Sequence, residues 1–592
     1  MAALHTEFST QAINDNNVSA SDKRTFSYIS QYGDIIYDAV IAQEPDWQVF
    51  HNLSGLRQGI FSWYDFSPGA SVLEVGAGFG ALTGLLCRRC ACVTATDRSF
   101  FRAQAVARRY EHRENLQVYA GDAQTIEFPE SFDYIIVIGL LERAGGGSSE
   151  AEPYAAYLRS LQRWLKPGGC FFIAVENRFG LRYFCGEPEP HTGMAFDGIN
   201  RYPRGTSGRS FSRREIADVV RAAGFGYHRF YYPLPDYKLP QLIYTDEYLP
   251  EKNLKERLIP YYRNSSSLVA SERELYDDIV ANSVFPFFAN SFLVECRMEE
   301  FKTCDKIASD ILYAAVSSDR GEARSYATVI HGNGIVRKTP LHEEGRSNAR
   351  KLYRNLQDLQ NHGIPVVEHR LLKGDVLEMP YISWPTLSNY IKEIMGQDQE
   401  EFLRLIDRIY AYILQSSEQV PEGENALPAA LGLRDEIPGS RMAQPGEGMG
   451  TSRERESGGD RESVYTPRFG PILKKAYMEL IPLNCFYHAD TGDFLYFDQE
   501  FVRENYPARY VLFRAIHYIY CFTPNAERYY PRKELLRKYD MEDTWDIYLR
   551  EETRFLDEVR NHKMYRQFYA KTKVDRGRIQ ENIRKMEDGS NA

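Results

Sequence analysis

The sequence predicts an α/β fold in which the first half of the chain is a doubly wound parallel sheet. Apolar runs of strand length alternate with helix-forming stretches between residues 71 and 175, a pattern typical of a sheet covered by helices on both faces. A glycine-rich turn at 76–80 follows the first apolar run. Such a turn lets backbone approach a ligand where a Cβ atom would clash, next to a helix N-terminus. The chain has 592 residues, enough for several domains.

The elements of this first half follow one another in a regular order. Residues 132–139, FDYIIVIG, are a continuous apolar run of the kind found in a parallel strand buried on both faces. Lys166-Pro167-Gly168-Gly169 predicts the end of a helix before the next strand. A sheet of this type binds its ligand at the carboxyl ends of the strands. We expect strands at 71–75, 91–97, 116–119, 132–139 and 170–175, and helices at 81–89, 101–110 and 154–165.

The glycine turn alone is compatible with two classes of cofactor. Gly76, Gly78 and Ala81 satisfy the looser G-x-G-x-x-G/A pattern of dinucleotide-binding folds. In methyltransferases a similar turn wraps the amino acid part of S-adenosylmethionine. Asp97 follows Gly78 by about 20 residues, the interval at which an acid meets a ribose diol in either class. The structural alternative for Asp97 is a cap on the next helix.

Five features occur in sequence order: Glu74-x-Gly76-x-Gly78-x-Gly80, Asp97, Gly121-Asp122-Ala123, the strand at 132–139 and the helix stop at 165–169. Together they resemble class I S-adenosylmethionine-dependent methyltransferases, which are Rossmann-like, and a nicotinamide enzyme does not need the last three. The resemblance implies that the glycines hold the methionine part and that Glu74 helps to position its ammonium group. It also implies that Asp97 binds the ribose hydroxyls and that Asp122, beside Ala123, binds the adenine amine.

Two insertions are expected around the acceptor side of this domain. A reversed hairpin formed by 227–232 and 288–296 should close the fold, with a long insertion at 236–285 between its strands. Another insertion-like segment runs through 176–193, where the acceptor should enter. His191 in this segment is a candidate general base, because its unperturbed pKa lies near neutrality; bracing of the loop is the structural alternative. Glu142 and Glu176, each close to the end of a strand, are rival candidates.

The second half predicts a different, α+β domain. A hairpin around 331–334 brings Lys338 to the end of its second strand, and a helix at 343–361 and a strand at 376–382 follow. This order is that of the N-terminal lobe of a protein kinase, without its G-x-G-x-x-G loop. Lys338 would hold the phosphates of ATP.

A second set of residues extends the kinase-like pattern. Glu479 precedes Asn484 by five positions, and Asp498 follows after a short hairpin with Gly492 at its turn. Asn484 and Asp498 would bind Mg²⁺, and Glu479 stands where the catalytic Asp belongs. The alternative interpretation is a loop and hairpin that bind no nucleotide.

Taken whole, the chain resembles bacterial methyltransferase–kinase proteins that terminate O-antigen and other surface polysaccharides. Residues 50–54, 63–64, 497–500 and 514–517 carry this likeness. It implies methyl transfer to a saccharide hydroxyl or glycan phosphate of a glycan or lipid-linked glycan. It also implies ATP and Mg²⁺ as cofactors of the second domain, and a glycosyltransferase partner bound by the helical tail. Both a bifunctional methyltransferase–kinase and a methyltransferase with a pseudokinase scaffold remain open.

Composition sets the remaining expectations. The formal charge of −10 gives no support for nucleic-acid binding, and no apolar run reaches the ~18–20 residues needed to span a bilayer. We therefore expect a cytoplasmic protein, either free or peripheral to the inner face of the membrane. The predicted domains are a methyltransferase at 1–300, a kinase-like domain at 301–530 and a helical tail at 531–592. A disordered insertion is predicted at 419–462, because its Pro-, Gly-, Ser- and Glu-rich composition cannot bury enough apolar surface.

Overall fold

The computed structural model of the chain describes residues 2–8, 18–252, 254–299, 310–421, 466–560 and 565–587. These residues form two compact units, one made of 1–343 together with 560–592 and the other of 344–559. The second unit is therefore inserted in the sequence of the first. The limits of the two units differ from the predicted domain limits. Strands up to residue 340 and helices after residue 565 belong to the first unit.

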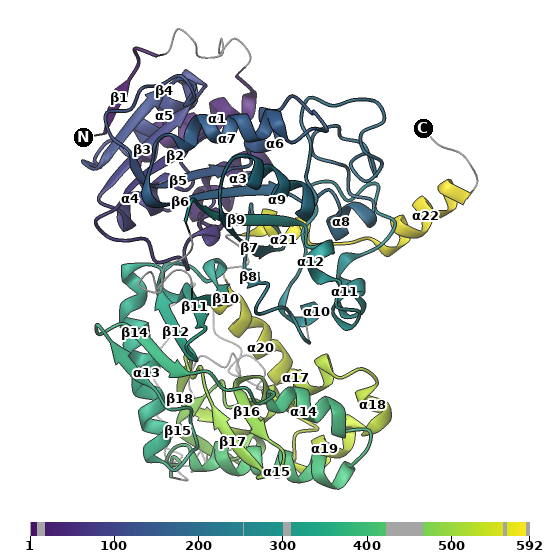
Figure 1. Cartoon of the computed structure of the whole chain (residues 1–592). Coiled ribbons are helices and arrows are strands. Elements are labelled where there is room, and N and C mark those ends of the chain that lie inside the picture. The colour runs from purple at the N-terminus through teal and green to yellow at the C-terminus, as the bar shows by residue number, and fades with distance from the viewer. Residues whose placement is uncertain are drawn as a thin grey trace, which may run out of the picture. The chain divides into compact units, whose positions relative to one another are not determined.

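A single sheet forms the frame of the first unit, with the strand order β1-β4-β3-β2-β5-β6-β9-β7-β8-β10-β11-β12 (Figure 1). Pairing is parallel from β1 to β6 and antiparallel beyond β6. The predicted doubly wound α/β fold is thus confirmed for this unit. The strands are β1 (Ala3–His5), β2 (Ser71–Val75), β3 (Cys92–Asp97), β4 (Leu116–Ala120), β5 (Phe132–Ile138), β6 (Leu165–Glu176), β7 (Tyr227–Leu234), β8 (Leu242–Thr245), β9 (Ser291–Arg297), β10 (Ile311–Val316), β11 (Tyr326–His331) and β12 (Ile335–Pro340).

Successive residues of the buried strands pack on opposite faces of this sheet. Leu73 and Ile135 lie in a core that also contains side chains of α7 (Glu152–Gln162) and α9 (Arg213–Ala222). Val72 and Ile136 lie in another core, with side chains of α4 (Thr83–Arg89) and α5 (Phe100–Arg109). This alternation is why the strand at 132–138 reads as a continuous apolar run.

The remaining helices of the first unit are short, apart from α1, α11 and α22. Helices α1, α3 and α21 share one apolar cluster, which includes Ile29, Phe50 and Phe568. These elements are α1 (Ala20–Tyr32), α2 (Asp38–Ile41), α3 (Trp47–Leu53), the 3₁₀ helix η3 (Gly55–Ile60), α6 (Leu141–Ala144), α8 (Leu181–Phe184), α10 (Leu254–Arg257), α11 (Glu272–Ala281), α12 (Phe285–Phe288), α21 (Arg566–Lys571) and α22 (Arg576–Glu587).

Three details differ from the predicted elements or complete them. The predicted reversed hairpin is confirmed, because β7 and β9 pair antiparallel. The insertion between them contributes β8, which pairs with β7 and β10 and was not expected. The predicted helix stop at 165–169 was wrong, because α7 already ends at Gln162 and these residues begin β6. The β5–β6 register shifts there, and Gly168 has φ 75°, a conformation that glycine supplies at an irregularity in a strand.

The described residues of the second unit form three antiparallel strand pairs and eight α-helices. The predicted hairpin between Asn484 and Asp498 is confirmed, since β16 and β17 pair antiparallel and Gly492 between them has φ 72°. The strands are β13 (Arg370–Leu372), β14 (Val376–Pro380), β15 (Ile472–Tyr477), β16 (Cys485–His488), β17 (Asp493–Tyr496) and β18 (Val502–Pro507). The helices are α13 (Arg346–Asn361), α14 (Leu387–Ile394), α15 (Gln399–Gln415), α16 (Thr466–Phe469), α17 (Ala508–Phe522), α18 (Ala526–Tyr529), α19 (Arg532–Lys538) and α20 (Trp545–Arg560).

The structure describes only the first residues of the predicted insertion, and it divides the predicted helical tail between the two units. Residues 422–462 of the predicted insertion lie outside the described residues, whereas Gln419 bridges to Leu473. Trp545, Tyr548, Phe555 and Val559 of α20 are buried in the core of the second unit, as expected for packing on that lobe. The predicted tail is not one body, because α21 and α22 belong to the first unit.

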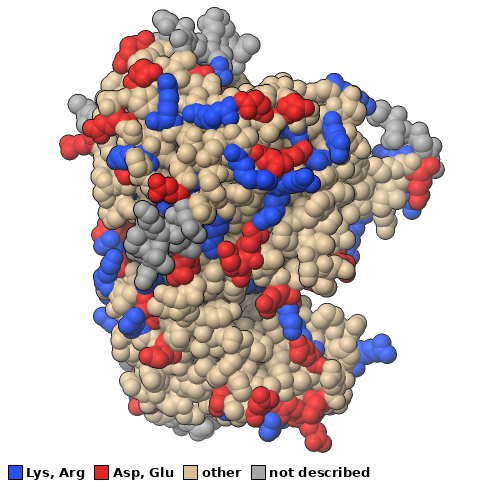
Figure 2. Space-filling view, in the orientation of Figure 1, with Lys and Arg blue, Asp and Glu red and all other residues tan. Residues whose placement is uncertain are grey.

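The surface and the helices give two further observations. Figure 2 shows acidic and basic side chains interspersed on the face in view. Within the described part of the chain, no helix is both long enough and apolar enough to cross a membrane.

Candidate active site

The glycine turn after β2 has the conformation that its sequence requires. Gly76, Gly78 and Gly80 have φ values of 71°, 59° and 78°, which glycine adopts without the steric cost of a Cβ atom. A Cβ on Gly76 would lie 2.4 Å from the Leu140 side chain, and one on Gly80 would lie 2.7 Å from the Tyr110 ring. A Cβ on Gly78 would meet nothing within 4 Å. Gly78 is therefore the point at which the turn borders open space.

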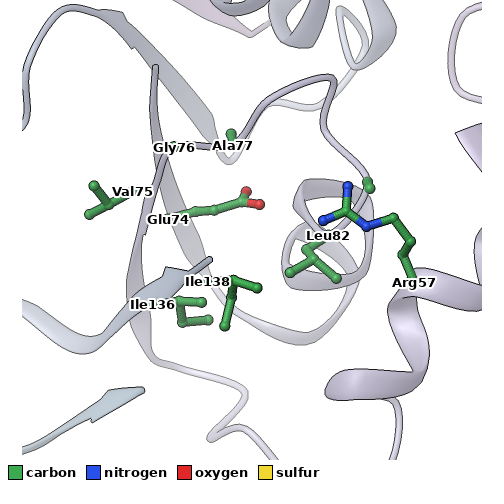
Figure 3. A pocket seen from close by; sticks show the side chains of 9 residues that line it. Arg57, Glu74, Val75, Gly76, Ala77, Leu82, Ile136 and Ile138 are labelled. Atoms are coloured by element: carbon green, nitrogen blue, oxygen red, sulfur yellow. The ribbon is translucent and has the colours of Figure 1, made fainter. Parts of the chain in front are cut away.

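A buried carboxylate and a guanidinium face each other across a small pocket beside this turn (Figure 3). Glu74 is 4% exposed, and its Oε2 accepts a 2.6 Å hydrogen bond from Thr83 Oγ1. Burial raises the pKa of Glu74 to about 7. Arg57 of η3 has no hydrogen-bond or ion-pair partner for its guanidinium among the described residues. Together the two groups present opposite charges suited to the ammonium and carboxylate of an amino acid.

Two predicted cofactor residues follow the neighbouring strands. Asp97 ends β3, where its Oδ2 accepts a 2.9 Å hydrogen bond from the Gly78 N–H and its Oδ1 accepts one from the Ser99 N–H. Asp97 is therefore tied directly to the glycine turn. Asp122 follows β4, and its Oδ2 lies 3.5 Å from Arg98 Nε. Parallel strands end at one edge of the sheet, so both carboxylates lie at the edge that carries the turn.

The strand β1, which the sequence did not predict, adds a side chain to this edge. It pairs parallel with β4, and the residues after it place Phe8 against Gly121, where a Cβ would lie 3.0 Å from the Phe8 Cβ. Ala123 next to Asp122 is buried. Phe8 thus lines the region where the resemblance places an adenine.

The three predicted catalytic residues of the first unit come together. Glu176 ends β6, and its N–H donates a 2.6 Å hydrogen bond to Oε1 of Glu142 in α6. The other carboxylate oxygen of Glu142, Oε2, lies 3.9 Å from Nε2 of His191. His191 Nε2 is buried and has no hydrogen-bond partner within the described ranges. A Cβ on Gly208 would lie 2.8 Å from His191 Nδ1, so glycine there leaves room for the ring.

The environments of these residues move their pKa values in different directions. Burial, followed by the charge of Glu176, raises the pKa of Glu142 to about 7. Burial acts in the same sense on Glu176, but Lys238 and Arg263 outweigh it and lower the pKa of Glu176 below its ordinary value. Burial lowers the pKa of the His191 imidazole to about 4. At neutral pH, His191 is therefore a neutral base beside a carboxyl group that is partly ionised.

Residues of the long insertion hold Glu176 in place, and the sequence did not single them out. Lys238 Nζ donates to Glu176 Oε1, and Arg263 Nη2 lies 3.4 Å from the same oxygen. Asp236 is fully buried and accepts hydrogen bonds from Arg182 Nη1 at 2.8 Å and Tyr261 OH at 2.7 Å. The one signal in the sequence was the dense polar and aromatic content of the insertion around 236–244.

The remaining predicted residues are divided between the two units. Lys338 on β12 of the first unit is buried, with Nζ 4.7 Å above the Tyr326 ring. In the second unit, Glu479 Oε2 accepts a 2.8 Å hydrogen bond from the Glu500 N–H. Burial and the charges of Asp498 and Glu500 raise the pKa of Glu479 to about 8.

The hairpin links the two predicted metal ligands of the second unit. The backbone oxygen of Asn484 accepts a 3.0 Å hydrogen bond from the N–H of Phe497, the neighbour of Asp498. Asp498 has φ 53°. Over the described residues, no group of three or more His, Cys, Asp or Glu side chains is placed to hold a metal ion.

Comparisons with known proteins agree with the site in the first unit. The family model of a methyltransferase domain matches residues 73–173. The probable ribosomal RNA small subunit methyltransferase A of Methanosarcina mazei is 36% identical over 83 residues, which are 14% of this chain and 30% of that protein. The ubiquinone biosynthesis O-methyltransferase of Pseudomonas putida is 30% identical over 143 residues, which are 23% of this chain and 57% of that protein.

Among solved structures, the N-methyltransferase NodS from Bradyrhizobium japonicum WM9 has a TM-score of 0.24 and 12% identity to this chain, and the match covers 41% of this chain and 94% of that one. The chain spans between about a third and somewhat more than half of the length of the curated relatives described above. Residues 73–173 therefore lie in an S-adenosylmethionine-dependent methyltransferase domain.

Proposed function

We propose that the first unit transfers a methyl group from S-adenosylmethionine to a hydroxyl or phosphate oxygen of a saccharide acceptor. The observation that carries this proposal is the convergence of Glu142, Glu176 and His191 at the strand edge that bears the glycine turn. One edge of the sheet thus holds residues for a methyl donor and residues that can remove a proton.

The donor site fits S-adenosylmethionine residue by residue. The ammonium group of its methionine part would meet Glu74, and the carboxylate would meet Arg57, whose guanidinium has no hydrogen-bond partner in the described structure. Asp97 would take the ribose hydroxyls, and Gly78 leaves the open approach that the ligand needs. When bound, the cofactor supplies an electrophilic methyl group on a sulfonium sulfur.

The acceptor side supplies the base. His191 is neutral above about pH 4, so its Nε2 can accept the proton of an acceptor hydroxyl throughout the ordinary pH range. Glu142, whose carboxylate lies 3.9 Å from this nitrogen, stabilises the imidazolium that forms. Glu176 keeps its charge beside Lys238 and Arg263 and holds Glu142 through its own N–H. The two carboxyl groups thus have different roles because their pKa values are separated.

Support for a saccharide acceptor comes from the resemblance of the whole chain to surface-polysaccharide methyltransferase–kinases. The match to an O-methyltransferase supports oxygen as the methylated atom. A glycan or lipid-linked glycan is the acceptor we propose, and a glycosyltransferase is the partner.

For the second unit we propose a kinase-like scaffold without phosphotransfer. The supporting observation is that Glu479, at the predicted catalytic position, accepts a hydrogen bond from the Glu500 N–H. With a pKa of about 8 it is mostly protonated at pH 7, so only a minor fraction of the molecules carries the carboxylate that a base requires. Binding of ATP·Mg²⁺ with transfer of phosphate to a glycan would contradict this proposal and support a bifunctional enzyme.

Calorimetry with S-adenosylmethionine tests the donor site directly. We expect the intact chain to bind it, and Arg57→Met to weaken binding by about 10–100-fold, because a charge-assisted hydrogen bond contributes ~1.5–3 kcal/mol. The exposed Arg214 provides the matched control, Arg214→Met. Methylthioadenosine lacks the amino acid part, so its affinity should not change in Arg57→Met. Absence of S-adenosylmethionine binding by the folded wild type would overturn the proposal.

A further inference from the structure

A segment that follows the second unit in sequence completes the acceptor side of the first. We call residues 565–582, which include α21, the return segment. Figure 1 shows α21 among the elements of the first unit. Phe568 is 2% exposed and packs in the cluster formed with α1 and α3, and Tyr565 OH donates a 2.8 Å hydrogen bond to Asp38.

The return segment binds the backbone of the insertion at consecutive residues. The Tyr262 N–H donates to the Lys571 carbonyl at 3.0 Å, and Lys571 Nζ donates to the Arg263 carbonyl at 3.0 Å. Asn582 Nδ2 donates to the carbonyls of Ser266 and Leu268 at 2.9 and 2.8 Å. These bonds fix residues 262–268 from one side.

From the other side, the same stretch of the insertion faces the catalytic carboxylates. Tyr261, whose ring lies 5.8 Å from that of Phe568, donates through its hydroxyl to Asp236. Arg263 Nη2 lies 3.4 Å from Glu176 Oε1, and its N–H donates to Glu187 at 2.7 Å. Lys571 is thus separated from Glu176 by the single residue Arg263.

We propose that the return segment positions Arg263 against Glu176, so that Lys571 and Phe568 are positioning residues of the methyl transfer reaction. This inference rests on the proposed function. It means that the methyltransferase site is assembled from sequence on both sides of the inserted unit. A chain lacking the return segment would keep the glycine turn and lose the ordered acceptor side.

The charged groups around Glu176 set its pKa, so a displacement of Arg263 would be measurable as a change in that pKa. The cations facing Glu176 are Lys238, Arg263 and Arg182, the anions are Asp236 and Glu142, and the neutral groups are Tyr183 and His191. A cation lowers the pKa of a neighbouring carboxyl group. Displacing Arg263 therefore raises the pKa of Glu176, so the limb of the pH–rate profile that belongs to Glu176, which lies below the Glu142 limb near pH 7, moves to higher pH.

The test uses the full chain with Lys571→Met, its conservative counterpart Lys571→Arg, and Lys573→Met as the matched control at an exposed lysine. In Lys571→Met we expect faster amide hydrogen exchange at Tyr262 and across 258–268. We also expect a fall of about tenfold in kcat with an unchanged KM for S-adenosylmethionine, because small displacements of catalytic groups are costly. Lys571→Arg should restore both values, and Lys573→Met should match the wild type.

Phe568→Ala provides a second variant with a larger expected effect on exchange across 258–268, because it removes the ring that packs on Tyr261. Unchanged exchange in both folded variants would overturn the positioning role. If the wild type failed to bind S-adenosylmethionine, the proposed function would fail, while the exchange measurements would still decide whether the return segment orders the insertion.

Discussion

The two units each carry a buried group of carboxyl residues, and the groups differ in how cations are placed beside them. In the first unit, Lys238 and Arg263 both contact Glu176, which keeps its charge, while the pKa of Glu142 rises to about 7. In the second unit, burial and neighbouring acids raise the pKa of Glu479 to about 8. Arg514, which opposes that rise, is hydrogen-bonded to Glu552 and to the Met478 carbonyl.

This difference is the one we expect between a site able to transfer protons and a buried acidic group. Cations placed on one carboxylate alone drive the pKa values of a pair apart, and separated values define an ionised and a protonated partner. A carboxyl group whose nearest charges are other acids stays protonated instead. The following predictions test whether this contrast has functional meaning.

The largest effect is expected at His191, the base that we propose for the first unit. His191→Ala should lower kcat/KM by about 10²–10⁴-fold, the contribution of a positioned general base. The measurement is transfer of tritiated methyl from S-adenosylmethionine to a panel of methyl glycosides and glycosyl phosphates. His112→Ala changes a histidine of the same unit whose side chain is 83% exposed, and it should have no effect. Equal rates for wild type and His191→Ala on a turned-over acceptor would remove His191 from the mechanism.

Substitution of one aspartate in each unit, Asp97 and Asp498, tests which ligand each unit binds. Asp97→Ala should weaken S-adenosylmethionine binding by about 100-fold, a loss of ~2.7 kcal/mol, because Asp97 both holds Gly78 and faces the ribose site. Asp498→Ala should leave that affinity unchanged. Calorimetry on the two full-length variants provides the comparison. If the wild type bound ATP·Mg²⁺ and Asp498→Ala abolished that binding, the second unit would be a nucleotide-binding domain.

A change of pH dependence is expected at Glu142. Glu142→Gln removes the carboxylate that stabilises protonated His191, so the rise of kcat/KM through about pH 7 should disappear. The remaining rate should lie about tenfold below that of the wild type at pH 8 and close to it at pH 5.5, where Glu142 is protonated in both. A pH–rate profile of both proteins on one acceptor decides this. If the rise of kcat/KM near pH 7 persisted in Glu142→Gln, it would belong to the titration of another group.

The sequence was sufficient for the parallel half of the fold, because its signals are local. The apolar run at 132–139 and the glycine turn report burial and backbone conformation within a few residues. Strands β1 and β8 are only three and four residues long, and their pairing depends on partners far away in sequence. Lys166–Gly169 looked like a helix stop, since a strand irregularity uses the same glycines.

The site was predictable to the same degree. Glu142, Glu176 and His191 were singled out as candidates because each follows a recognisable strand or loop, and the structure places them close together at the sheet edge. Arg57 and Lys238 lay in segments without a motif, and their roles depend on which carboxylate they face. The return segment could not be found from sequence, because its contact with 262–268 joins residues about 300 positions apart.

The smallest effect concerns stability and tests the second unit alone. The pKa of Glu479 is about 8 in the folded chain against an ordinary value of 4.5. The folded state therefore holds this proton more tightly, and the wild type loses stability as pH rises from about 4.5 through 8. Glu479→Gln stays neutral and can still accept the Glu500 N–H, so it should be more stable than the wild type by about 1–3 kcal/mol at pH 8.5.

Calorimetric unfolding at two pH values measures this contrast. In the transition that S-adenosylmethionine does not shift, Glu479→Gln should raise Tm by about 2–8 °C at pH 8.5 and by far less at pH 4.5, where Glu479 is protonated in the folded state and half protonated in the unfolded state. Added Mg²⁺ sharpens the result. A scaffold should respond equally in both proteins, whereas a metal site at Asn484 and Asp498 would stabilise the wild type more than Glu479→Gln, because an ionised Glu479 also gains from a nearby cation.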